Sequence, residues 1–343
     1  MSFQVMVVRN GCGAKKPPLK SCAHMLKTLA NAVLLFLLPV FPCLAQLHWS
    51  KVDTAYGALP SSLHVYRSND SLHGFPSIAY YVSARLKDKR LQFTTSTGQG
   101  KRFTPAQYFQ LEQFPLVVVN CTFFSLISGQ PLSLLVKDGR LQSYGVTSLR
   151  GTGNDSVLYY YPTRGAIGID RKRRPDVAWT FTDSSRRWPY AFEDMPVVAK
   201  GTDTIPVIYD LKDIEWKWWK MRTAVGGGPV LVHDGRIRIT DREEQLFPDA
   251  TRDGEHLPRT AMGYTRDGRL IILVIQGRAP GVAAGASLQE VAQILLDLGC
   301  YEALNLDGGG SSCLLVNGKE TIRPSDPEGQ RPLPAVFLIR RSN

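Results

Sequence analysis

The chain has 343 residues, of which 43% are hydrophobic and 21% charged, so it has the composition of an ordinary globular protein with enough length for a substantial core. The first 45 residues hold five of the 41 basic residues and no acidic one, which leaves 36 − 30 = +6 for the rest. Because this charge is modest and forms no block of lysine and arginine, it argues against a nucleic-acid partner and suits an acidic or phosphorylated substrate.

The first predicted element is an apolar segment, NAVLLFLLPVFPCLA, at residues 31–45. It follows Lys27, is short for a membrane span, and ends in the small-x-small pattern Cys43-Leu44-Ala45. These features are typical of a secretory signal peptide cut before Gln46. We therefore expect an exported protein, periplasmic or extracellular, with no transmembrane span in its mature chain.

Two points about this segment stay open. Met25 would start a signal of ordinary length, so residues 1–24 need not be translated, and a lipid anchor on Cys43 is the alternative to cleavage.

Beyond the signal we expect a single domain over residues 46–343, because the sequence shows no repeat and no low-complexity linker. Its first part, residues 46–77, is expected to be an N-terminal extension, since the informative motifs begin at about residue 78.

Tight turns dominate the rest of the chain. Four dipeptides that tolerate positive φ lie between apolar or β-branched runs, which predicts hairpins with two-residue turns. They are Asp138-Gly139, Asp234-Gly235, Asp267-Gly268 and Asn317-Gly318. The predicted fold class is therefore α+β, a strand-rich mixed sheet with several hairpins.

One helix is strongly indicated. Ser287 and Glu290 form a capping box, an apolar stripe follows, and Gly299 ends the helix. The runs Leu270–Gln276 before it and Ala303–Leu306 after it are predicted strands. Strand, helix and strand within so few residues predict a βαβ unit with parallel strands.

The βαβ unit predicts where a ligand binds, because the carboxyl ends of its strands and the amino end of its helix lie at one edge. Gln276, Glu290 and the run Asp307–Gly310 should meet there. If the Asp267-Gly268 turn has two residues, Arg259 lies opposite Gln276 and joins the same edge.

The run Asp307-Gly-Gly-Gly-Ser-Ser312 is the most informative part of that edge, and it matches neither GxGxxG nor the P-loop pattern. Glycine amides can form an anion-binding nest and serine hydroxyls add donors, although glycines that merely allow a tight corner explain the run equally well. Structural roles are also open for Gly226–Gly228, as a bulge, for Asn120, as a turn residue, and for Glu290, as a helix cap.

Metal and disulfide chemistry receive little support. Cys121, Cys300 and Cys313 are widely spaced, and neither a CxxC pair nor a His/Cys cluster is present in the sequence. We therefore expect no cofactor and no zinc site, while a divalent metal and a disulfide between two of these cysteines stay open.

Six motifs lie in order along about 200 residues: Asn120–Phe124, Leu135–Arg140, Ala224–Pro229, Pro258–Gly263, the helix Ser287–Leu295, and Asn305–Ser312. Together they resemble the motifs of the phosphodiester glycosidase family. Three positions depart from the family pattern, because Cys121 and Thr122 replace glycines and Gln276 replaces an aspartate.

The resemblance implies hydrolysis of a sugar-1-phosphodiester between the anomeric carbon and the phosphate oxygen. Asp307 is then expected to be the nucleophile or base, with Glu290 as the second candidate and Asn120 orienting the substrate. The phosphate is assigned to Arg259, the amides of Gly308, Gly309 and Gly310, and the hydroxyls of Ser311 and Ser312. The motifs further imply substrate contacts at Gly226, Gly227, Gly228, Thr260 and Asn305.

Two other functions use the same crevice. A non-catalytic glycan-binding protein of the cell envelope would explain the lost carboxylate at Gln276. A transferase that moves a sugar phosphate during exopolysaccharide assembly would need the same donor pocket. The expected partner in each case is a phosphorylated glycan or a sugar-1-phosphodiester.

Overall fold

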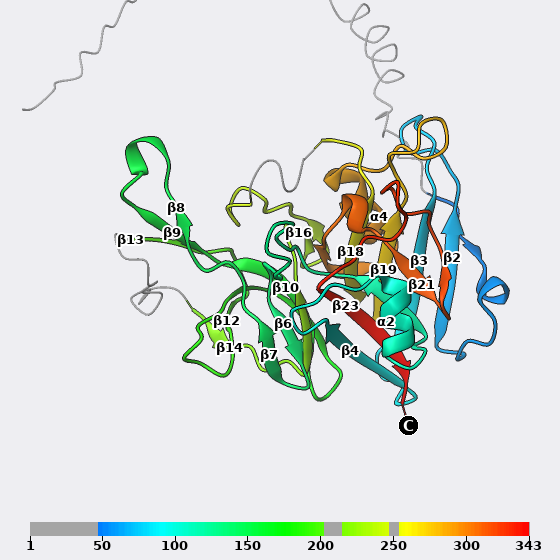
Figure 1. Ribbon diagram of the computed structural model, residues 1–343, viewed down its shortest axis with the longest axis horizontal. Coiled ribbons are helices and arrows are strands. Elements are labelled where there is room, and N and C mark those ends of the chain that lie inside the picture. The colour runs from blue at the N-terminus through cyan, green and yellow to red at the C-terminus, as the bar shows by residue number, and fades with distance from the viewer. Residues whose placement is uncertain (1–46, 202–214, 247–253, 343) are drawn as a thin grey trace, which may run out of the picture. The chain divides into compact units, whose positions relative to one another are not determined.

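A computed structural model describes residues 47–201, 215–246 and 254–342, and the residues between Ala45 and Asn343 group into one unit (Figure 1). The predicted signal peptide lies outside the described residues. No helix in the described part is long and apolar enough to cross a membrane. Strands in four sheets and two α-helices make up the regular structure of this part, which confirms the predicted strand-rich α+β class.

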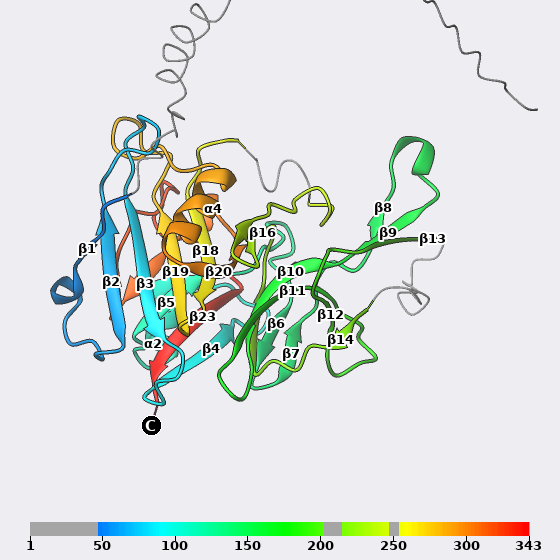
Figure 2. The ribbon, with the colours of Figure 1, turned by 180° about the vertical axis from the view of Figure 1, so that it is seen from behind.

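The largest sheet has eight strands, each antiparallel to its neighbours, and carries the βαβ unit (Figure 2). In spatial order the strands are β1 (Ser50–Lys51), β2 (Leu63–Ser68), β3 (Ala79–Arg85), β19 (Arg269–Ile275), β18 (Arg259–Thr265), β20 (Cys300–Asn305), β16 (Val230–His233) and β17 (Arg236–Ile237). Because β18 is antiparallel to both β19 and β20, those two strands run parallel, as predicted.

A five-stranded sheet and a seven-stranded sheet complete the main body. The first contains β22 (Lys319–Glu320), β21 (Leu314–Val316), β5 (Val117–Asn120), β23 (Ala335–Arg341) and β4 (Leu91–Thr97). The second contains β14 (Lys217–Trp218), β12 (Tyr190–Phe192), β11 (Pro175–Phe181), β10 (Arg164–Ile169), β15 (Thr223–Gly226), β6 (Leu135–Lys137) and β7 (Arg140–Ser143). A small sheet is formed by β13 (Val198–Gly201), β9 (Tyr159–Pro162) and β8 (Leu149–Arg150).

Alternating side chains divide the core into layers. One face of the eight-stranded sheet packs against the other two large sheets. Leu304 of β20 and Leu306, just beyond its end, belong to that core. Its other face, which includes Ala303, is covered by α4 (Leu288–Asp297). The shorter helix, α2 (Pro105–Leu111), covers the outer face of the five-stranded sheet through Tyr108.

The helix α4 forms where the sequence predicts it. The Ser287 side chain accepts from the Glu290 amide, the Glu290 carboxylate accepts from the Ser287 amide, and Gly299 follows the helix with a φ of +81°. Leu288, Val291 and Leu295 are fully buried against the sheet, and each contributes about 1.5 to 3 kcal/mol by leaving water. The helix is thereby held with its amino end at the ligand edge.

Three of the four predicted two-residue turns are confirmed, since both central residues have positive φ at Asp138-Gly139, Asp234-Gly235 and Asn317-Gly318. The fourth prediction was wrong. Tyr264 pairs with Leu270, and of Asp267 and Gly268 only the glycine has positive φ, so the β18–β19 loop has three residues, 266–268.

That extra loop residue changes the register of β18. Arg259 lies opposite Ile275, not Gln276 as predicted. Because paired residues point to the same face and Ile275 packs against the α4 layer, Arg259 also points to the α4 side.

Candidate active site

The glycine run lies between β20 and β21, and both of its ends are held by Asn120. This side chain has no exposed surface. Its Nδ2 donates to the carbonyl oxygen of Asp307 at 2.6 Å, and its Oδ1 accepts from the Cys313 amide at 3.1 Å and from the Thr260 hydroxyl at 2.9 Å. Both polar atoms of the carboxamide therefore bond inside the protein, which gives Asn120 a positioning role at the loop.

The carboxylate of Asp307 lies just beyond the end of β20. The residue is half-buried, its amide donates to the Cys121 carbonyl at 3.0 Å, and its Oδ2 atom is inaccessible, with no hydrogen-bond partner among the described residues. Burial raises the pKa of Asp307 to about 6, although the Ser311 hydroxyl, the Arg331 charge and the Gly308 amide all act to lower it. This carboxylate is a stronger base than an ordinary aspartate.

The three glycines are explained by what lies against them. A Cβ on Gly308 would come within 2.9 Å of the Pro258 carbonyl oxygen, and one on Gly310 within 2.1 Å of both Asp326 and Arg331. Gly309 has a φ of +59°, and its amide donates to Pro258. The glycines therefore allow other parts of the protein to pack closely against the turn. This agrees with the structural role that the sequence left open, in which the glycines allow a tight corner.

An ion pair that the sequence does not predict covers the turn. Arg331 binds Asp326 through two hydrogen bonds, of 2.7 and 2.9 Å, and its third nitrogen donates to the Ser311 hydroxyl at 3.3 Å. Because Asp326 takes two of the guanidinium nitrogens, Arg331 neutralises Asp307 only in part.

A pocket of about 580 Å³ opens beside the turn. Arg278 lines it, and its guanidinium lies 3.3 Å from the position that a Cβ on Gly309 would take. Arg323 lines the same pocket, and its backbone amide donates to the Gln276 side chain at 2.9 Å. Both arginines are exposed and have no side-chain hydrogen bond or ion pair among the described residues. Glu320 and Asp326 line the same pocket, and Asp326 is paired with Arg331, so the two arginines are its free donors for an anion.

Arg259 is placed differently from the sequence prediction. It is 4% exposed, and its guanidinium donates to the backbone carbonyls of Ala286 at 2.8 Å and Glu255 at 3.0 Å. These bonds tie the start of β18 to the segment before α4. The structure therefore gives Arg259 a positioning role at the ligand edge.

Glu290 is the helix cap, which is the structural role that the sequence left open for it. Its carboxylate also contacts two histidines. Its carboxylate accepts from the Ser287 amide at 2.7 Å and faces His73 Nδ1 at 2.7 Å and His256 Nε2 at 3.0 Å. Burial alone would raise the pKa of Glu290, but these contacts outweigh it and hold the pKa below its usual value. An ionised carboxylate with so many partners is poorly suited to proton transfer.

The second glycine run is structural. The amides of Gly226, Gly227 and Gly228 donate to the carbonyls of Leu134, Gly165 and Asn305, respectively. A Cβ on Gly227 would lie 2.3 Å from the Asn305 carbonyl oxygen. The Asn305 side chain, in turn, donates to the Gly228 carbonyl at 2.8 Å. These residues join two sheets closely behind the site.

The remaining predicted substrate contacts are buried. Thr260 is fully buried and bonded to Asn120, and its hydroxyl lies 3.3 Å from that of Ser312, which is 1% exposed. Ser311 is also 1% exposed and faces Arg331. Of the predicted set, the structure brings Asn120, Thr260, Asp307 and the glycine turn together.

The described residues contain one group of possible metal ligands, His233, Asp234 and Glu302, on β16, its turn and β20. The Glu302 carboxylate is already used by Tyr264 and by the Val177 amide, and His233 lies between the two carboxylates. Cys121, Cys300 and Cys313 are buried free thiols, so none of them forms a disulfide.

The sequence interpretation missed Arg278, Arg331, Asp326 and Arg323. Arg278 could have been found, because it follows the end of β19 by three residues and so lies at the predicted ligand edge. The other three lie in the irregular segment between β22 and β23, where neither periodicity nor turn residues indicate a position in space.

Comparisons with known proteins agree with this architecture. A sequence model of the family described as Phosphodiester glycosidase matches residues 191–340. The N-acetylglucosamine-1-phosphodiester alpha-N-acetylglucosaminidase of Mus musculus is 40% identical over 210 residues, 61% of this chain and 33% of that protein. Its Bos taurus counterpart is 41% identical over 103 residues, 28% of this chain and 19% of that protein. The chain thus spans a third or less of the length of these relatives.

Solved structures share the fold. A hypothetical protein from Synechocystis matches with a TM-score of 0.56 and 17% identity, over 87% of this chain and 68% of that one. The zebrafish N-acetylglucosamine-1-phosphodiester alpha-N-acetylglucosaminidase catalytic domain, auto-inhibited by its pro-peptide, matches with a TM-score of 0.53 and 19% identity, over 87% and 89%. The resemblance to the phosphodiester glycosidase family is confirmed.

Replacement of Asn120 tests its role in holding the loop. In Asn120→Ala the Asp307 carbonyl and the Cys313 amide lose their shared partner inside the protein. We expect the free energy of unfolding to fall by about 2 to 4 kcal/mol, because each unsatisfied buried group costs about 1 to 3 kcal/mol. Urea unfolding measures this. Asn154→Ala, at an exposed position, is the control, and equal stability of the two variants would contradict the role.

The raised pKa of Asp307 predicts a pH-dependent stability cost. Since the folded pKa, about 6, exceeds the ordinary value of 3.8, the folded state binds the proton more tightly, and stability falls as pH rises from about 4 to about 6. Asp307→Asn removes this cost. We expect the variant to exceed the original protein by about 3 kcal/mol well above pH 6, and by much less near pH 4. A difference that does not change with pH would refute the shift.

Proposed function

We propose that this protein hydrolyses a sugar-1-phosphodiester between the anomeric carbon and the phosphate oxygen, with N-acetylglucosamine as the sugar. The observation that carries the proposal is a base next to an anion pocket: Asp307, with a pKa raised to about 6, adjoins the glycine turn on which Arg278 lies. The family match and the names of the relatives support the reaction and the sugar. The N-terminal apolar segment supports export as part of the same proposal.

The phosphate is assigned to the pocket lined by Arg278 and Arg323. Each guanidinium can offer two parallel donors to phosphate oxygens, and neither is taken by a carboxylate among the described residues. Arg331 lies against Ser311 and remains paired with Asp326, which itself lines the pocket. The substrate phosphate would then lie over Gly309, where the backbone carries no side chain.

Asp307 acts as the general base in this arrangement. A water molecule gives its proton to the carboxylate while its oxygen bonds to the anomeric carbon. The bond from that carbon to the phosphate oxygen breaks, and its electron pair leaves with the phosphate monoester. Because the second pKa of such a monoester is about 6, it leaves without strong help from an acid. The buried, ionised Glu290 is therefore not needed as a proton donor.

Replacement of Asp307 tests the assignment. Asp307→Asn keeps the shape of the side chain but cannot accept a proton, so kcat should fall by about 10²- to 10⁴-fold while the fold is retained. In the original protein kcat/KM should rise with pH through about 6, as the carboxylate ionises. Turnover of a nitrophenyl-phosphate diester of N-acetylglucosamine measures both, with Asp267→Asn as an exposed control. An active Asp307→Asn protein would remove Asp307 from the reaction.

The stereochemistry of the product separates a base from a nucleophile. Attack by water on the anomeric carbon inverts its configuration, whereas a covalent intermediate on Asp307 would retain it. NMR of the sugar at early times should therefore show inversion. Retention would assign Asp307 as the nucleophile, and a sugar transferred to an added alcohol would favour the transferase.

The two arginines at the edge should respond differently to the same change. Arg278→Lys keeps the charge but loses the planar pair of donors, so we expect KM for the diester to rise about tenfold with unchanged thermal stability. Arg259→Lys breaks the contacts to the Ala286 and Glu255 carbonyls, so the melting temperature should fall while KM changes little. The opposite pattern would assign the phosphate to Arg259.

A further inference from the structure

A second pocket, of about 430 Å³, lies where β23 ends, near the carboxyl terminus marked in Figure 1. We call it the arginine pocket, because it is lined by Arg173, Arg222, Arg340 and Arg341, together with Gln92, Glu112, Gln113, Phe114, Pro115 and Ser342. Its volume is in the range of ordinary ligand sites. Four cations face one carboxylate in this lining, so its formal charge is +3.

The arginine pocket is separate from the proposed active site. Val336, near the start of β23, pairs with Asn120, which holds the catalytic loop. Arg340 lies four residues further along the same strand, a distance of roughly 13 Å at 3.3 Å per residue. The two pockets therefore lie at opposite ends of β23.

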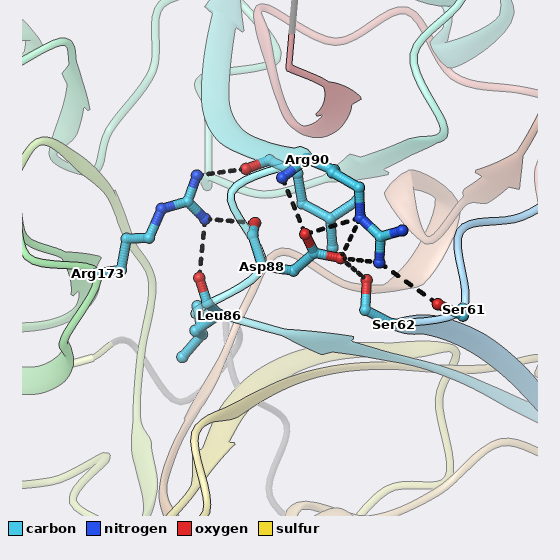
Figure 3. A network of polar contacts seen from close by, with 7 residues as sticks. Ser61, Ser62, Leu86, Asp88, Arg90 and Arg173 are labelled. Carbon is cyan, nitrogen blue, oxygen red and sulfur yellow. Dashed lines mark hydrogen bonds and ion pairs between the residues drawn. The ribbon is translucent and has the colours of Figure 1, made fainter.

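Arg173 lines this pocket, and Figure 3 shows the hydrogen bonds that hold its guanidinium. Its guanidinium donates to the carbonyls of Leu86, Asp88 and Leu91, at 2.6 to 3.0 Å. The Asp88 carboxylate is bound instead by Arg90, at 2.8 Å. Backbone dipoles thus hold Arg173 in place, and the acid nearest to it is used by another arginine.

The other three arginines keep donors for a ligand. Arg222 has one ion-pair partner among the described residues, Asp138 at 3.6 Å, which is beyond hydrogen-bond reach. Arg340 pairs with Glu112, but its Nε is buried and has no partner in the described structure. Arg341 donates one nitrogen to the Ala58 carbonyl at 3.0 Å. Gathering these like charges costs free energy unless an anion joins them.

The backbone of the pocket wall is strained in three places. Gln113, Phe114 and Arg173 all have positive φ, of 58°, 60° and 62°, which is uncommon for residues other than glycine. The Phe114 ring is 64% exposed beside the arginines. At Gln113 and Phe114 this backbone ends helix α2, since the Phe114 amide donates to the Phe109 carbonyl. The helix end thereby presents an exposed aromatic ring next to cations, where it can stack on the apolar face of a sugar.

We propose that the arginine pocket binds an acidic sugar unit of a glycan, with its phosphate, sulfate or carboxylate group held by Arg222, Arg340 and Arg341 and its ring against Phe114. An anion here would accept from the free guanidinium donors and offset the repulsion between the arginines. The site would hold an acidic polysaccharide chain at a point remote from the bond that is cut.

Calorimetry with glucose 6-phosphate and with inorganic phosphate tests this proposal. Every protein in the series carries Arg278→Gln, so that the catalytic pocket contributes little to anion binding. We expect glucose 6-phosphate to bind at one site, more tightly than inorganic phosphate. The double substitution Arg222→Gln with Arg341→Gln should weaken the binding of glucose 6-phosphate at least tenfold. Arg242→Gln removes one exposed charge elsewhere and is the control.

Phe114→Ala separates a sugar site from a site for free anions. This substitution should weaken the binding of glucose 6-phosphate several-fold and leave the binding of inorganic phosphate unchanged. If the two ligands bind equally and Phe114→Ala is silent, the pocket takes a free anion and the proposal is wrong. The proposal also fails if no saturable binding occurs, or if Arg242→Gln weakens binding as much as the paired pocket substitution. Matching melting temperatures would show that all variants are folded.

Discussion

The carboxamide of Asn120 is the interaction on which the proposed site depends. It is buried at the end of β5, and it holds the carbonyl of Asp307 and the amide of Cys313, the two ends of the glycine loop. Its oxygen also accepts from Thr260 on β18, so one side chain connects two sheets and the loop. Because each of these groups lies out of water, releasing any one of them would leave an unpaired polar group. The loop therefore has one strongly preferred position.

That position explains the basicity of Asp307. Burial works against the charged form, and Arg331, the cation whose charge lowers the Asp307 pKa, shares two of its nitrogens with Asp326. The glycines at 308 and 310 allow Pro258 and the ion pair to pack this closely, which keeps water from one carboxylate oxygen. Glu290 shows the opposite outcome, because its many hydrogen bonds overcome burial and keep its pKa low. The surroundings of these two carboxylates thus shift their pKa values in opposite directions, up for Asp307 and down for Glu290.

The sequence predicts the parts of the fold that depend on local patterns. Helix α4 has both its cap and its stop residue, and the predicted strand that contains Ala303 and Leu304 is present as β20. The register of β18 was predicted incorrectly because a two-residue and a three-residue loop share the same Asp-Gly signal, and one residue reverses the face on which Arg259 lies. Arg331 and Asp326 could not be predicted, since only the folded chain brings an irregular segment over Gly310. The family motifs indicate the loop, but they do not distinguish residues that would touch a substrate from those that hold the loop in place.

Direct titration of the Asp307 carboxyl group by NMR is the measurement that bears most closely on this site. The carboxyl carbon of Asp307, assigned by comparison with Asp307→Asn, would be followed through a pH series in the intact protein. We predict a midpoint near 6, set by burial in the loop that Asn120 holds. A midpoint at the ordinary aspartate value of 3.8 would contradict the claim that burial makes this carboxylate a base.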